Sequence, residues 1–159
     1  MNTRIHAASL ASLLVASSFA AFGQGKACAL ATPAELEALG GKATMAAGTM
    51  GTVETCNGTA GAANVLIRLI KRTGDAQKSN EQAGVEAVKK MGATVETKTF
   101  GPIFCVAVTP SAKLAAYGFT TSCTVSKHPI YAVIEVKTQK EGTPIDKLRP
   151  IAEKMASRF

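Results

Sequence analysis

The residues of this chain best suited to chemistry are four cysteines, Cys28, Cys56, Cys105 and Cys123. None of them stands in a Cys-x-x-Cys motif, which thiol-exchange enzymes and many zinc sites use. In a small exported domain, an even number of widely spaced cysteines instead predicts structural disulfides. We therefore expect two disulfide bonds, no free thiol and no bound metal.

Four cysteines allow three connectivities. Cys105 and Cys123 lie in consecutive strand-like runs, and directly opposed strand residues bring their α carbons within bridging distance. This bridge leaves Cys28 to pair with Cys56, each bridge contributing about 3–4 kcal/mol in the chain-entropy model. The alternative is a bridge from Cys28 to Cys105 or Cys123, which requires the first helix to pack over the second half of the sheet.

The other side chains capable of catalysis are isolated in the sequence. His128 precedes Pro129 in an expected turn, and His6 lies in the N-terminal segment. No serine stands in a G-x-S-x-G motif, and the acidic residues form no facing pair. The glycine-rich stretches match neither the dinucleotide-binding nor the phosphate-binding motif. The sequence thus predicts a non-enzymatic protein with no catalytic residue and no cofactor.

The first 23 residues have the features of a secretory signal peptide. Arg4 supplies the positive charge, residues 10–22 form an apolar core, and small residues permit cleavage after Gly23 or, alternatively, after Ala20. That core is shorter than the roughly 20 apolar residues that cross a bilayer. We expect a periplasmic or secreted protein with no transmembrane anchor after cleavage.

Residues 24–159 are the length of one ordinary domain. The whole chain has 18 Lys and Arg against 11 Asp and Glu, a formal net charge of +7. The positive residues are dispersed and no aromatic residues interleave with them, whereas nucleic-acid binding needs a clustered basic footprint. We therefore expect no nucleic-acid partner and interpret the positive charge as a solvated basic surface.

Hydrophobic periodicity and turn signals predict an α+β domain with the order α-β-β-α-β-β-β-α. This order is typical of an antiparallel sheet, here of about five strands, with helices packed on one face. Three helices are expected, at residues 32–40, at residues 79–91 and from residue 143. Five strands are expected, at residues 52–56, 64–72, 103–108, 121–126 and 130–137.

Glycine, proline and asparagine set the expected ends of these elements. Asn57-Gly58 predicts a tight turn between the first two strands, and Lys127-His128-Pro129 predicts a short turn between the last two. Pro150 falls inside the third helix, where a proline removes one backbone hydrogen bond. We expect it to kink that helix or to end its first segment.

The strand at residues 130–137 has one apolar face and one mixed face. Tyr131, Val133, Glu135 and Lys137 share the mixed face, a combination suited to binding a ligand. We predict a ligand site on the sheet face that no helix covers, or at the mouth between the sheet and the helix at residues 79–91. Ordinary solvent exposure of this face is the alternative.

A short motif runs through the N-terminal half: Cys28-Ala-Leu-Ala-Thr-Pro-Ala-Glu-Leu, then Cys56 at a strand end, then a helix closing on Met91-Gly92. It resembles small disulfide-stapled bacterial extracytoplasmic domains, among them secreted lipoproteins of unknown function and extracellular sensor domains of serine/threonine kinases. The chain departs from them in having Lys26 where a lipobox would stand, and no kinase or transmembrane segment. The resemblance implies a ligand-sensing or envelope-associated module with a Cys28–Cys56 bridge, and it supplies no catalytic residue.

These features together predict an exported binding or interaction domain whose partner is a protein or small molecule of the cell envelope. One alternative is an inhibitor or immunity protein that blocks a partner enzyme. The other is a hydrolase whose nucleophile, base and orienting group are brought together by the fold from distant positions.

Overall fold

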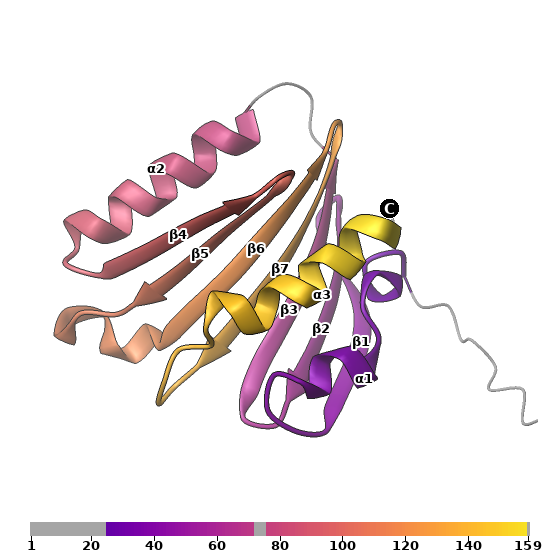
Figure 1. Ribbon diagram of the computed structural model, residues 1–159, viewed down its shortest axis with the longest axis horizontal. Helices are drawn as coiled ribbons and strands as arrows, with labels where there is room; N and C mark the ends of the chain where they lie inside the picture. Colours follow the sequence, from indigo (N-terminus) through magenta and orange to yellow (C-terminus); the bar gives the residue numbers. More distant parts are fainter. Residues whose placement is uncertain (1–24, 72–75, 159) are drawn as a thin grey trace, which may run out of the picture.

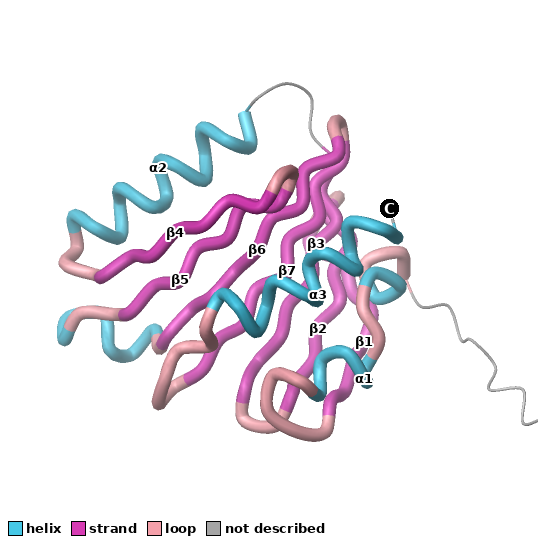
Figure 2. The backbone as a smooth tube through the Cα atoms, viewed as in Figure 1, coloured by secondary structure: helices cyan, strands magenta, loops and turns pink. Residues whose placement is uncertain are grey.

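Seven strands form one antiparallel sheet in the order β1-β2-β3-β7-β6-β5-β4 (Figures 1 and 2). The computed structural model describes residues 25–71 and 76–158, so the predicted signal peptide lies outside the described residues. The helices are α1 (Pro33–Glu37), α2 (Ala76–Lys90) and α3 (Ile145–Arg158), with 3₁₀ helices η1 (Cys28–Leu30) and η2 (Ala112–Tyr117). The strands are β1 (Ala43–Met50), β2 (Val53–Ala60), β3 (Ala63–Lys71), β4 (Thr94–Phe100), β5 (Ile103–Thr109), β6 (Phe119–Lys127) and β7 (Ile130–Thr138).

The predicted antiparallel sheet with helices is confirmed, but the expected count of about five strands is wrong. The two additional strands are the sheet edges, β1 and β4, so the order becomes α-β-β-β-α-β-β-β-β-α. Most side chains of β1 and β4 are exposed or half-buried. An edge strand with little buried surface needs few apolar residues, which is why neither segment has the alternation that predicts a strand.

The tight turn predicted at Asn57-Gly58 is also wrong, because β2 continues through both residues. A side chain at position 58 would collide with the backbone carbonyl of Thr44 on β1, so glycine there permits close strand approach rather than a turn. The chain reverses instead at Gly61, whose φ of 59° lies in the left-handed region that glycine adopts without strain. The turn predicted between the last two strands is present at His128-Pro129.

Helices α1 and α3 cover one face of the sheet, which we call the core face. The buried residues of α3 follow helical spacing: Ile145, Leu148, Ile151, Ala152 and Met155. Pro150 does not end the helix, which continues to Arg158. Three of those buried residues lie beyond Pro150, and their packing outweighs the single backbone hydrogen bond that the proline removes.

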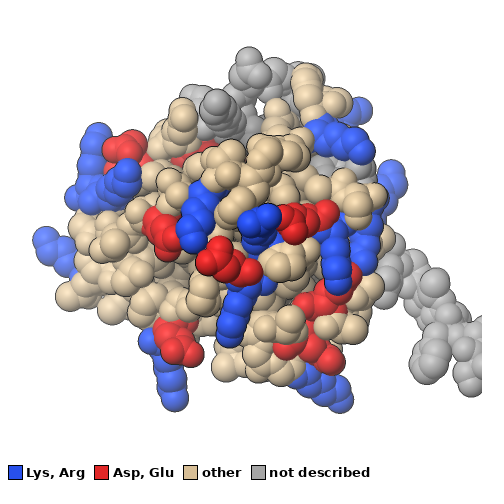
Figure 3. Space-filling model, viewed as in Figure 1, with Lys and Arg blue, Asp and Glu red and all other residues tan. Residues whose placement is uncertain are grey.

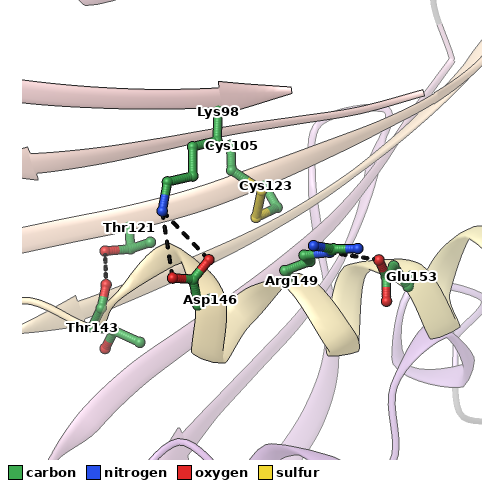
Figure 4. The surroundings of a disulfide bond; sticks show 8 residues. All are labelled: Lys98, Cys105, Thr121, Cys123, Thr143, Asp146, Arg149 and Glu153. Carbon is green, nitrogen blue, oxygen red and sulfur yellow. Dashed lines mark hydrogen bonds and ion pairs between the residues drawn. A yellow bond between two sulfur atoms is a disulfide. The ribbon is translucent and has the colours of Figure 1, made fainter. Parts of the chain in front are cut away.

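Both predicted disulfides, Cys28–Cys56 and Cys105–Cys123, are confirmed. Cys105 and Cys123 are direct partners in the β5–β6 register, with α carbons 4.1 Å apart, and their bridge lies beneath α3 (Figure 4). Cys28 in η1 reaches Cys56 on β2 with α carbons 4.9 Å apart. All four cysteines are at most 3% exposed. The Cys28–Cys56 bridge therefore ties the N-terminal segment to the sheet.

The expectation that all helices pack on one face is wrong, because α2 lies over the face opposite to α3. Glu81 of α2 lines a hollow together with Arg68 and Val133, whose side chains point away from the core face. None of residues 80–90 is buried. Because this helix buries so little apolar surface, its sequence carries no strong signal of the face on which it packs.

Glu35 joins α1 to the C-terminal end of α3. It closes the capping box of α1 with Thr32, and it also accepts hydrogen bonds from Arg158 at 2.6 and 2.7 Å. Lys154 adds an ion pair at 3.3 Å. The hydrogen bonds from Arg158, followed by those from Thr32 and Lys154, lower the pKa of Glu35 from its ordinary 4.5 to about 2 despite partial burial of the carboxylate.

We expect Glu35→Gln to lower the free energy of unfolding at pH 7 by about 2 kcal/mol, because glutamine keeps the cap but loses the charge. The loss is smaller than the full pKa shift implies, since Arg158 and Lys154 are partly exposed. A depressed carboxyl pKa stabilises the fold above the unfolded pKa, and this contribution disappears as the pH falls from about 5 towards 2. Urea unfolding at pH 7 and pH 2.5 measures the difference, with the exposed Glu37→Gln as the matched control. If Glu35→Gln lowered the free energy of unfolding equally at pH 7 and at pH 2.5, the loss could not come from the charge of Glu35.

Candidate binding site

The four predicted site residues, Tyr131, Val133, Glu135 and Lys137, lie on one side of β7. The residues that alternate with them, Ala132, Ile134 and Val136, belong to the hydrophobic core, whereas Tyr131 and Val133 are also buried but lie outside that core cluster. The four therefore belong to the opposite face of the sheet, which we call the second face. Their cross-strand partners on β3 are Ile70, Arg68, Leu66 and Asn64, and those on β6 are Ser126, Thr124, Ser122 and Thr120.

Three hollows follow β7 along the second face, and residues of α2 line all of them. The Tyr131 hollow, of about 410 Å³, is also lined by Phe104, Ser126 and Glu81. The Arg68 hollow, of about 210 Å³, shares Glu81 and contains Val133. The Tyr117 hollow, of about 460 Å³, contains Glu135, Lys137, Met91, Leu114 and Tyr117. Together we call them the groove.

A charged cluster lies at the middle of the groove. Glu135 accepts a hydrogen bond from Arg68 at 3.0 Å and forms an ion pair with Lys137 at 3.1 Å. Its side chain is 17% exposed, and the two cations facing one carboxylate leave a net positive charge. The Nε atom of Arg68 is buried and has no hydrogen-bond partner among the described residues. A buried donor without a hydrogen-bond partner costs about 1–3 kcal/mol.

Hydroxyl and apolar side chains run in parallel rows beside this cluster. Every second-face position of β6 carries a hydroxyl group, and the next strand, β5, is apolar on the same face. Hydroxyls both donate and accept hydrogen bonds, whereas an apolar row favours desolvation of a ligand. The β6 row is Thr120, Ser122, Thr124 and Ser126, and the β5 row is Phe104, Val106 and Val108.

The core face, which α1 and α3 cover, has a different surface. Basic and acidic side chains are intermixed over α3 and its neighbours (Figure 3). Several are paired: Arg149 with Glu153 at 2.7 Å, and Lys98 of β4 with Asp146 at 3.4 Å (Figure 4). The first pair lies within α3 and the second joins α3 to β4, and exposed ion pairs of this kind contribute little individually.

Other chemistry considered from the sequence finds no assembled counterpart in the described residues. No group of three or more His, Cys, Asp and Glu side chains that could hold a metal ion is present in that part of the chain. His128 lies exposed in the β6–β7 turn. Within the same residues, no helix combines the length and apolar character needed to cross a bilayer.

Sequence reasoning did not select Arg68 or the apolar side chains of the Tyr117 hollow. A signal for Arg68 was present, since it is the one charged residue among the apolar positions of β3 that point to the second face. Met91 directly follows α2 and is 49% exposed. Leu114 and Tyr117 lie on η2, where no helix was expected.

Comparisons of the chain with protein-family models, with curated proteins and with solved structures find no match. The resemblance to bacterial extracytoplasmic domains therefore stays a prediction. The function of this chain must be inferred from the groove and from the residues that line it.

Proposed function

We propose that this protein is an exported, non-enzymatic binding domain and that the groove is its ligand site. The observation that carries the proposal is the position of the Arg68–Glu135–Lys137 cluster, which lies within a lined groove rather than on a flat surface. Ligand sites are typically concave, largely apolar and equipped with a few convergent polar groups. The groove combines these features over the length of β7.

Export is supported by two features. The first 23 residues have the pattern of a signal peptide, and the domain contains two disulfides, which persist in oxidising compartments. Binding rather than catalysis is supported by the chemistry of the groove. Glu135 is held by two cations, and no histidine or cysteine of the described ranges lines any of the three hollows.

The proposal is tested by two-dimensional NMR of isotope-labelled protein titrated with a small-molecule extract of the cell envelope. We expect shift changes confined to residues of β7, β6 and α2 that line the groove. Arg68→Met is expected to weaken the response at least tenfold, because a hydrogen bond to a charged group is worth about 1.5–3 kcal/mol. The exposed Lys42→Met serves as the charge-matched control and should bind normally.

Two results would contradict the proposal. One is turnover of a test ester or glycoside that Glu135→Gln abolishes, which would show that the groove is an active site. The other is a stoichiometric protein partner, isolated from the envelope by pull-down, whose binding is unaffected by Arg68→Met. That result would favour an inhibitor or immunity protein that acts through another surface.

A further inference from the structure

The Tyr117 hollow has an exposed apolar wall. Three large hydrophobic side chains are substantially exposed in the described chain, and two of them, Met91 at 49% and Tyr117 at 74%, line this hollow. Leu114 and Val88 are half-buried beside them, and none of the six residues of η2 is buried. Exposed apolar groups gathered in one concave place indicate a binding surface rather than ordinary surface composition.

The same hollow contains a cationic side chain. The Lys137 side chain is 51% exposed, and its Nζ pairs with Glu135 at 3.1 Å. An ammonium group has three N–H donors, so one ion pair leaves donors for an incoming anion. Glu135 is already shared with Arg68, so its negative charge is compensated before any ligand arrives. Only one lysine lies in this hollow, which suits a ligand with a single anionic group.

We propose that the Tyr117 hollow binds a long-chain carboxylate, with its head at Lys137 and its apolar tail against Met91, Leu114 and Tyr117. This inference rests on the proposed function and specifies its ligand class. The volume of about 460 Å³ falls within the roughly 300–1,000 Å³ typical of small-molecule sites. The excess of Lys and Arg over Asp and Glu, which remains without Arg4 of the predicted signal peptide, attracts anions to the surface as a whole.

The test measures binding of three probes to the purified protein by isothermal titration calorimetry. Decanoate carries both head and tail, 1-decanol carries the tail alone, and acetate carries the head alone. We expect decanoate to bind at least tenfold more tightly than either of the others. Lys137→Met should remove most of the preference for decanoate over decanol, whereas Lys137→Arg should retain it. Leu114→Asn should weaken both long-chain probes, and Lys42→Met should change neither.

Thermal unfolding of each variant first establishes that it folds, and the Lys137→Arg variant keeps the test decisive if Lys137→Met is unstable. Equal affinity for decanoate and decanol, or a preference for decanoate that survives in Lys137→Met, would overturn the assignment of the anionic head. No binding of decanoate, while an envelope extract still shifts groove residues, would overturn the ligand class and leave the proposed function standing. No shift of groove residues by any ligand would overturn both.

Discussion

Replacing Cys105 and Cys123 together by alanine is expected to lower the free energy of unfolding by about 3 kcal/mol, and the same replacement of Cys28 and Cys56 by slightly more. The paired cysteines are separated by 18 and 28 positions, and the entropy that a bridge removes from the unfolded chain grows slowly with loop length. The two losses together are a large share of the free energy of unfolding of a typical domain, which is roughly 5–15 kcal/mol. Each bridge is therefore expected to be required for a stable fold.

The two bridges act on different states of the chain. Cys105 and Cys123 join strands that are already hydrogen-bonded neighbours, so their bridge constrains mainly the unfolded ensemble. Cys28 and Cys56 also hold η1 against β2 in the folded state. Urea unfolding with and without reductant measures both effects, and reduction should raise the m-value because the unfolded chain exposes more surface. The variant without cysteines is the control, since reductant should not change it. An unaltered melting temperature after reduction of the parent would show that the bridges are dispensable.

Leu148→Ala is the second change with a large expected effect, a loss of about 3 kcal/mol or more in the free energy of unfolding. Leu148 is fully buried, and α3 packs over β6 and the Cys105–Cys123 bridge. Truncating a buried leucine removes its transfer free energy and leaves a cavity, which together cost about 2–5 kcal/mol. Chemical denaturation measures the loss, with the exposed Lys147→Ala on the same helix as control. A loss below about 1 kcal/mol would mean that α3 is not closely packed on the sheet.

The central strands could be predicted because their buried side chains leave a regular pattern of apolar residues in the sequence. β3 and β7 are apolar on the core face at every other position, and the capping box at Thr32 and Glu35 specified the start of α1. β1 could not be predicted, since it is paired on one side only and its Ala, Thr and Gly residues have no alternation of polarity. Its strand conformation is imposed by hydrogen bonding to β2, a tertiary effect.

Part of the candidate site was likewise accessible from the sequence. Alternation along β7 placed Tyr131 and Lys137 on one face, and the structure agrees. The depth of the groove could not be predicted from the sequence, because it depends on which face of the sheet α2 covers. The Arg68–Glu135 pair joins residues 67 positions apart, and no local pattern in the sequence reports such a separation.

The pairing of β3 with β7 has a consequence for the order in which the chain folds. Each other strand pair of the described sheet joins consecutive strands, within β1–β3 or within β4–β7. Closing a long loop costs more chain entropy than closing a short one, so we expect the two meanders to form first and to join at the β3–β7 seam afterwards. Arg68 and Glu135 lie on opposite sides of that seam. A partly folded chain would therefore have no assembled charged cluster, and a ligand that needs the complete groove would bind and stabilise only the completed fold.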